Sequence, residues 1–372
     1  MDPSAGNGAT TIVMGNCGVG FAPVRPGGEK SLIELMEGVE DIPGTALYEG
    51  IEWGQWESFP EYMDYIASRR YSLDIGAQVA HGALRYYVMG ERGKENLDAT
   101  NEDLNEMSRL VTQALTAGAV GFSTSRTIGH RALDGSPVPG TFAPDQELSA
   151  IAQAMRKAGR GVFEMIPAGT VGKLEGLGGE RTTPEAELTL MADFSRQSGR
   201  KVTFTLVQSP DYAPDTWERL LEMVVTANQT GAQLFPQVPS RPIGLASGLS
   251  GYHAFQRRPT YMKLTHLSLA ERAREMAKPE VKAAIMSEGD VPVDQPGSMA
   301  NMYQLFQNAA GFMYPLADPV DYEPDPSNML GSRAASTGEN VLSLLYDYML
   351  EQNGAAMCAL MGGANVHESQ EV

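Results

Sequence analysis

Cysteine is scarce in this chain, which has two cysteines, Cys17 and Cys358, among its 372 residues. Two cysteines cannot build a disulfide framework, and such scarcity is typical of proteins from a reducing compartment. The N-terminal segment has no basic stretch ahead of an apolar run, so it does not resemble a secretory signal. No run approaches the roughly 18 apolar residues of a membrane-spanning helix. We therefore expect a cytoplasmic protein that does not enter a membrane.

Positive charge is also in short supply. The chain has 28 Lys and Arg against 46 Asp and Glu, a net charge of -18, and acidic residues are dense between Glu29 and Asp64. This balance repels phosphate backbones, so nucleic acid is not an expected partner, and the acidic segment is interpreted as a solvated face. The 42% of hydrophobic residues is ordinary for a globular protein.

Several motifs of well-known enzymes are missing. The sequence has no HxH, HxxEH or HExxH pair, no G-x-S-x-G elbow and no P-loop. A short glycine-rich run, GNCGVG, has the wrong spacing for a dinucleotide-binding loop. The sequence alone therefore shows no complete metal, serine-hydrolase or nucleotide site.

A helix-like stretch, a glycine and a short β-rich run recur through the middle of the chain, around Gly118, Gly159, Gly199 and Gly231. Each glycine suits the position after a helix, where a left-handed conformation is needed. Helices are predicted at 100–117, 144–158 and 184–198, and strand-like runs near residues 12 and 75 bring the strands before residue 240 to at least six. We predict one domain over residues 1–372, a (β/α)8 barrel rather than an open doubly wound sheet.

In a barrel the functional side chains stand at the carboxyl ends of the strands. Cys17 and Glu164 follow or lie within such strands, and either could be functional. Cys17 is a small buried residue, a metal ligand or a nucleophile with His81 as its base. Glu164 is either paired with an Arg or functional, because a carboxylate inside an apolar strand needs a partner. The remaining histidines lie in loops or at helix starts and are predicted to be exposed: His130, His253, His266 and His367.

Long strings of the sequence resemble the N-acyl-D-amino-acid deacylase or D-aminoacylase family of the amidohydrolase superfamily (amidohydrolase family 3). The strings are GATTIVMGNCGVGFAPVRPG, LIELMEGVEDIPGTALYEGIEWGQWESFPEYMDYI, GAQVAHGALRYYVMGERG and AGAVGFSTSRTIGHRALDGSPVPGTFAPDQEL. The resemblance is dense from about residue 4 to residue 260. It implies a metal-dependent hydrolase barrel joined to a small β-domain.

The resemblance implies that Cys17 of GNCG binds zinc or another divalent metal, with Glu164 in place of a family histidine. The other expected site residues come from their positions at or just after strand ends. His81 is the expected catalytic residue, and the expected substrate contacts are Ser123, Arg126 and Arg241.

The family's HxH on the first strand and its later segment with a catalytic Asp have no counterpart here, and Leu206 stands where a second ligand histidine is expected. We therefore expect a barrel incomplete at both ends, without its first and last strands and the small β-domain.

The predicted function is metal-assisted hydrolysis of the carbon–nitrogen bond in N-acyl-D-amino acids or related small N-acyl compounds. Because of the missing histidines and aspartate, little turnover is expected of the chain as given. Two alternatives remain at this point: an inactive barrel that binds a small molecule or a partner, and a cysteine hydrolase that uses Cys17 with His81.

Overall fold

A computed structural model of the chain describes residues 3–209, 211–213, 215–238, 243–293, 301–316, 319–321 and 324–362. The chain divides into two compact units, Met1–Val238 and Pro239–Val372. The sequence-based prediction treats residues 1–372 as one barrel domain. That domain assignment stays a prediction. In the structure the parallel sheet ends at Gln237, and the residues that follow have their own hydrophobic core.

The first unit alternates strands and helices. Its strands are β1 Thr11–Met14, β2 Asp74–Ala80, β3 Gly121–Ser125, β4 Val162–Ile166, β5 Val202–Thr205 and β6 Leu234–Gln237. Its longer helices are α2 Glu29–Glu40, α4 Phe59–Ala67, α5 His81–Met89, α7 Asn101–Ala117, α8 Asp145–Ala158, α9 Pro184–Ser198 and α10 Thr216–Gln229. Its short helices are α1 Pro3–Gly6, η1 Asn16–Gly18, α3 Gly44–Gly50, α6 Glu91–Lys94 and η2 Glu175–Leu177.

The predicted helix ends are confirmed because local chemistry sets them. Thr100 caps α7 in a capping box with Asp103. The residues after α7, α8 and α9 are Gly118, Gly159 and Gly199, all in the left-handed conformation.

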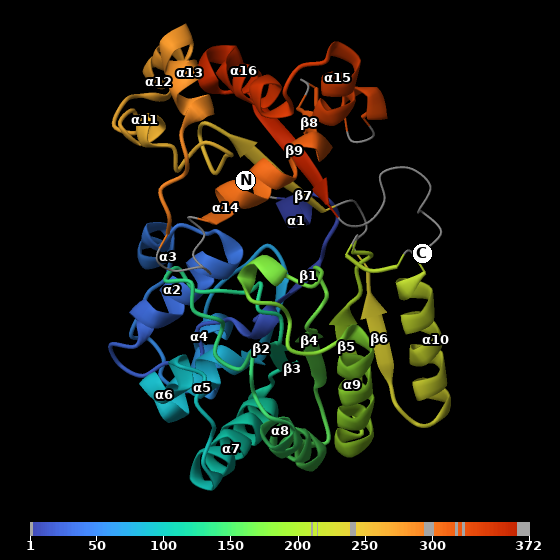
Figure 1. The fold of residues 1–372 in the computed structure, drawn as a ribbon. Helices are drawn as coiled ribbons and strands as arrows, with labels where there is room; N and C mark the ends of the chain where they lie inside the picture. Colours follow the sequence, from blue (N-terminus) through green and yellow to red (C-terminus); the bar gives the residue numbers. More distant parts are fainter. Residues whose placement is uncertain are drawn as a thin grey trace. The chain divides into compact units, whose positions relative to one another are not determined.

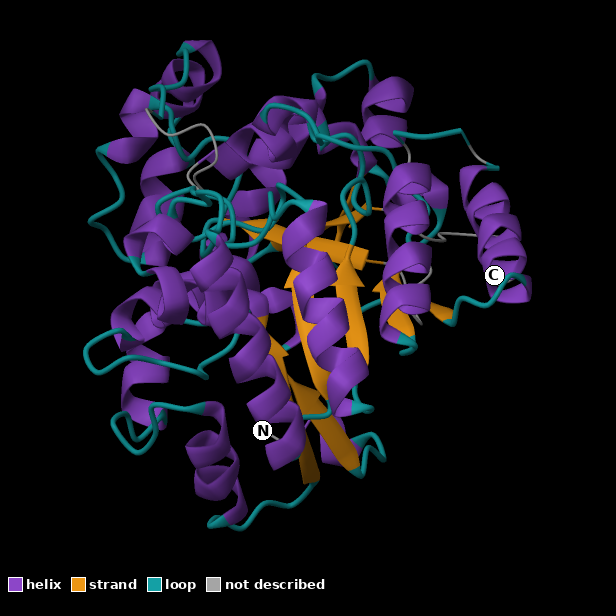
Figure 2. Cartoon of the chain, turned by 90° about the horizontal axis from the view of Figure 1, so that it is seen from below, coloured by secondary structure: helices purple, strands orange, loops and turns teal. Residues whose placement is uncertain are grey.

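The six strands form one parallel sheet in the order β1-β2-β3-β4-β5-β6 (Figures 1 and 2). Helices α7, α8, α9 and α10 follow the strands in turn and pack on their neighbours in chain order (Figure 1). A sequential parallel order with helices on one face is the arrangement of a curled half-barrel. Within the described residues the sheet has six strands, not the eight of a closed barrel.

The core of the first unit lies between the sheet and its helices. Phe122 of β3 and Phe163 of β4 are fully buried there, and the Phe163 ring stacks on that of Phe194 from α9 with 3.8 Å between centroids. The opposite face of the sheet is more open, since Val13 of β1 and Phe235 of β6 are each 46% exposed. The sheet therefore has a packed helix-facing side and an open, concave side.

The second unit has an antiparallel sheet in the order β7-β9-β8, built of β7 Ile243–Gly248, β8 Met313–Pro315 and β9 Met357–Gly362. Its helices are α11 Pro259–Met262, α12 Leu269–Met276, α13 Pro279–Ser287, α14 Met302–Asn308, η4 Ala310–Phe312, η5 Pro326–Asn328, α15 Leu330–Thr337 and α16 Val341–Gly354. Among the helices described in either unit, none has the length and apolar character needed to cross a membrane.

Candidate active site

A tight loop follows β1 and carries Cys17. Gly15 and Gly18 have φ angles of 89° and 72°, and a side chain on Gly15 would come within 2.7 Å of the Gln78 carbonyl oxygen. Between them Cys17 has a φ of 59°, a conformation that residues other than glycine adopt at a cost. The two glycines let the loop fold against the end of the sheet, and they leave Cys17 in a strained backbone.

Two inward-facing side chains of the neighbouring strands hold this loop. The Ser123 hydroxyl donates to the Gly15 carbonyl and accepts from the Gly18 N–H at 3.2 Å. The Cys17 N–H donates to Glu164 Oε2 at 3.1 Å. Ser123 and Glu164 are partners in the register of β3 and β4, so their side chains are neighbours on the same face. Cys17 and Glu164, which are both expected to bind a metal, therefore lie side by side.

The Glu164 carboxylate is in an unusual electrostatic position. Its residue is 9% exposed, and among the described residues its carboxylate receives the Cys17 N–H but forms no ion pair. Burial raises the pKa of Glu164 to about 7, although the hydrogen bond from Cys17 opposes the shift. Burial, followed by the charges of Glu164 and Glu40, raises the pKa of the Cys17 thiol. The result is a protonated thiol beside a carboxyl group that can exchange a proton near neutral pH.

His81 lies on the other side of the sheet end, fully buried. Its Nδ1 is 2.8 Å from Thr124 Oγ1 and its Nε2 is 2.7 Å from Glu147 Oε1, so both ring nitrogens are engaged. Thr124 follows Ser123 in the strand and faces the helices, since successive strand residues alternate between faces. The structure therefore does not bring His81 to Cys17 as a nucleophile–base pair. The catalytic role of His81 stays a prediction.

A buried ion pair completes the His81 cluster. Arg85 Nη1 donates to both carboxylate oxygens of Glu147, at 2.6 and 2.5 Å. Burial would raise the pKa of Glu147, but the hydrogen bond from His81 and the charge of Arg85 hold that pKa well below its usual range. Burial lowers the pKa of His81, and the neighbouring Glu147 only partly offsets this shift. We conclude that the cluster consists of ionised Glu147 and Arg85 with a neutral His81 at neutral pH.

The two predicted substrate arginines differ in outcome. Arg126 pairs with Glu187 of α9, with Nε to carboxylate distances of 2.9 and 3.0 Å, and its Nη1 donates to the Ala143 carbonyl. Burial raises the pKa of Glu187, with the charge of Arg126 opposing it. These contacts hold Arg126 toward the helices, and its contact with a substrate stays a prediction. Arg241 lies outside the described residues.

The prediction that the other histidines are exposed is wrong for His253, which is buried, and His130 is half-buried. His130 Nδ1 lies 2.9 Å from the hydroxyl of Ser125 at the end of β3, and burial lowers its pKa to about 4. His253 of the second unit is fully buried, and burial lowers its pKa to about 3. His266 is exposed as predicted, and His367 lies outside the described residues. The sequence held one signal for His130. Alternation along FSTS places Ser125, the hydrogen-bond partner of His130, on the same face of the sheet as Ser123.

The described residues supply few ligands for the expected divalent metal. Cys17 and Glu164 are two candidate donors, whereas a catalytic zinc takes about three protein ligands. Over the described ranges of the chain, no group of three His, Cys, Asp or Glu side chains is placed to hold a metal ion. Leu206, at the position expected for a histidine, is instead buried in the hydrophobic core. The described residues alone do not fit a catalytic zinc site, and the metal-binding roles of Cys17 and Glu164 stay predictions.

Comparison with known proteins finds related sequences, although no family model matches the chain. A D-aminoacylase of Alcaligenes xylosoxydans xylosoxydans is 29% identical over 124 residues, which are 33% of this chain and 22% of that protein. An N-acyl-D-glutamate deacylase of the same organism is 27% identical over 153 residues, or 41% of this chain and 26% of that protein. The chain thus matches about a quarter of the length of these relatives.

A solved structure shares the fold. The N-acyl-D-glutamate deacylase from Bordetella bronchiseptica, complexed with zinc and a phosphonate inhibitor, superposes with a TM-score of 0.51 at 16% identity. The superposition covers 98% of this chain and 56% of that one. At this identity the likeness shows the fold alone, and it agrees with a curled parallel sheet.

Proposed function

The chain belongs to the family of the D-aminoacylases and N-acyl-D-amino-acid deacylases, and from that premise we propose that it hydrolyses the amide bond of N-acyl-D-amino acids or related small N-acyl compounds. The reaction is placed at the carboxyl end of the six-stranded sheet, between Cys17 and Glu164. We also propose that this sheet is part of a (β/α)8 barrel, in which this end is the usual position of the active site.

One observation carries the proposal: the Glu164 carboxylate is buried at this edge without a cation. Hydrolysis of an amide needs a group that accepts a proton as water attacks the carbonyl carbon and then returns it to the leaving nitrogen. Such a group works best when its pKa is close to the working pH. Burial raises the pKa of Glu164 to about 7. Glu164 is therefore assigned the movement of the proton.

The neighbouring groups position Glu164. The Cys17 N–H orients its Oε2, and the Ser123 hydroxyl fixes the backbone on both sides of Cys17. Ser123 is therefore proposed to support the loop that carries Cys17. Its contact with a substrate stays a prediction. A role for Cys17 and Glu164 as ligands of a divalent metal stays a prediction, and no step of the proposed reaction depends on it.

The test is an assay for release of free amino groups from N-acetyl-D-glutamate, N-acetyl-D-aspartate and N-acetyl-D-methionine, with the three L-enantiomers as controls. Each is measured with and without added zinc. The sequence alone predicts little turnover, but the buried Glu164, which forms no ion pair among the described residues, leads us to expect the opposite. The unmodified chain should turn over at least one D-substrate. This turnover should be lost in Glu164→Gln and kept in Glu218→Gln, which changes an exposed glutamate of α10.

Absence of turnover with all substrates, with or without zinc, would overturn the proposal and agree with the low turnover expected from the sequence. Metal content measured in the unmodified chain and in Cys17→Ser checks the predicted ligand role separately. Equal metal content in the two proteins would contradict a ligand role for Cys17.

A further inference from the structure

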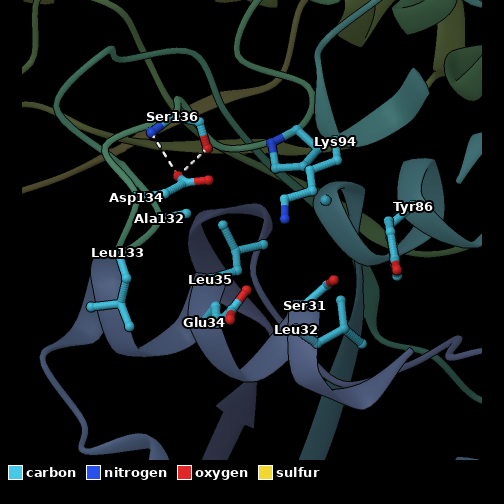
Figure 3. A pocket seen from close by; sticks show the side chains of 12 residues that line it. Ser31, Leu32, Glu34, Leu35, Tyr86, Lys94, Ala132, Leu133, Asp134 and Ser136 are labelled. Atoms are coloured by element: carbon cyan, nitrogen blue, oxygen red, sulfur yellow. Dashed lines mark hydrogen bonds between the residues drawn. The ribbon is translucent and has the colours of Figure 1, made fainter. Parts of the chain in front are cut away.

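A second site is suggested by a pocket of about 230 Å³ in the first unit, away from Glu164 (Figure 3). It lies between helix α2, helices α5 and α6, and the loop that follows β3. The apolar part of its lining includes Leu32, Leu35, Ala132, Leu133 and Pro139. One water molecule takes about 30 Å³ in the liquid, so the pocket has room for a small organic molecule.

Charges of both signs line this pocket. Lys94, the last residue of α6, extends into it, and Glu34 of α2 and Asp134 of the loop lie around it (Figure 3). The Ser136 N–H and hydroxyl donate to Asp134 Oδ1 at 2.9 and 2.6 Å, which fixes that carboxylate in place. Glu34 faces Lys30 across 3.7 Å and is 35% exposed, a loose surface pair that leaves it able to accept another cation.

The charge pattern selects the ligand. A molecule with only a carboxylate would satisfy Lys94 but would face two carboxylates of like sign. A molecule with only an ammonium would satisfy the carboxylates and be repelled by Lys94. A molecule that carries both charges on one carbon can meet both signs, while an aliphatic side chain covers Leu32 and Leu35.

We propose that this pocket binds a free α-amino acid with an aliphatic side chain. Its carboxylate contacts Lys94, its ammonium contacts Glu34 and Asp134, and its side chain packs on the apolar lining. An N-acyl amino acid is excluded because acylation removes the ammonium charge. The binding requires no turnover at Glu164, although free amino acids are also the product class of the proposed hydrolysis.

The first experiment measures binding by isothermal titration calorimetry, with L-leucine and D-leucine as probes. Three analogues remove one charge each: 3-methylbutylamine, 4-methylpentanoate and N-acetyl-leucine. We expect at least one leucine enantiomer to bind, and each analogue to bind at least tenfold more weakly, equivalent to about 1.4 kcal/mol. Failure of both enantiomers to bind at millimolar concentration, or an amine that binds as tightly as leucine, would overturn the proposal.

Matched variants then locate the binding. Lys94→Met keeps an unbranched side chain but removes its charge, and is expected to weaken leucine binding at least tenfold. Lys157→Met alters an exposed lysine of α8 and should leave binding unchanged. Circular dichroism and the melting temperature verify that each variant is folded.

Unchanged binding in Lys94→Met, or an equal loss in Lys157→Met, would contradict the site. Glu164→Gln should bind leucine like the unmodified chain, so failure of the proposed hydrolysis and failure of this proposal give different results.

Discussion

Buried carboxylates have different partners on the two faces of the six-stranded sheet. On the helix-facing side, Glu147 receives two hydrogen bonds from Arg85, and Glu187 receives two from Arg126. On the concave side, Glu164 receives one backbone N–H from Cys17 and, among the described residues, has no cation beside it. All three residues are buried, so burial alone does not distinguish them.

The presence or absence of a cation distinguishes carboxylates that stabilise the fold from one with a proposed role in the reaction. A buried carboxylate paired with arginine holds two elements together, since either partner alone would be left as an isolated charge. A buried carboxylate without a cation costs stability, and such arrangements are concentrated at functional sites. The helix-facing pairs therefore hold the fold together, and Glu164 lies at the edge where we propose the reaction.

Removal of a helix-facing cation is the largest expected effect on stability. Arg85→Met leaves Glu147 buried without its arginine and should lower the free energy of unfolding by about 3 to 5 kcal/mol. Urea denaturation followed by circular dichroism measures this loss. The control is Arg109→Met, which breaks the exposed pair with Glu106 and should change stability by about 1 kcal/mol or less. Similar losses in the two variants would contradict a structural role for the Arg85 pair.

His253 extends the comparison to the second unit, where a buried titratable side chain has no ion partner. Its Nδ1 accepts from the Phe255 N–H, and its Nε2 has no hydrogen-bond partner among the described residues. Burial lowers its pKa from 6.5 to about 3, so between these values the unfolded chain binds the proton more strongly than the folded chain.

The stability contributed by neutral His253 is therefore complete above about pH 6.5 and is lost as the pH falls toward 3. The expected slope is up to about 1.4 kcal/mol per pH unit. His253→Asn retains an acceptor for Phe255 but does not titrate in this range. Unfolding measured from pH 7 to pH 4 should show a shallower pH dependence in this variant, and equal slopes would argue against a neutral, buried His253.

The smallest expected effect concerns the strained backbone of Cys17. Because its φ is 59°, Cys17→Gly should relieve strain and raise the free energy of unfolding by about 1 kcal/mol or less. The same change should abolish any metal bound through the thiol. Thermal unfolding is the measurement, with Cys358→Ala as a control that removes the buried thiol of β9 and creates no such gain. A destabilised Cys17→Gly protein would show that the loop is not strained.

Much of the first unit could be predicted because its signals are local. The capping box of Thr100 and the glycines at 118, 159 and 199 set helix ends within a few residues of their own sequence. Glu164 could be selected because a carboxylate inside an apolar strand needs a partner, and Cys17 because functional side chains stand at the carboxyl ends of barrel strands.

The remaining features depend on contacts between distant residues. The partner of Arg126 is 61 residues away, and Glu147 meets His81 across 66 residues, so no local pattern marked either pair. The burial of His253, the partial burial of His130 and the division after Val238 likewise arise from tertiary packing. Arg126 and His81 were placed correctly at strand ends, but the sequence did not show that their side chains face the helices.

The most direct test of the central claim compares two buried glutamates, one from each face, by turnover and stability in the same preparations. Glu164→Gln should lower turnover at least about 100-fold while the protein stays folded, because it removes a proton acceptor that supports no ion pair. Glu147→Gln should lower the free energy of unfolding by about 3 to 5 kcal/mol, because Arg85 then lies buried opposite a neutral amide. A Glu164→Gln protein that keeps its turnover, or that unfolds as readily as Glu147→Gln, would contradict the assignment of Glu164 to the reaction.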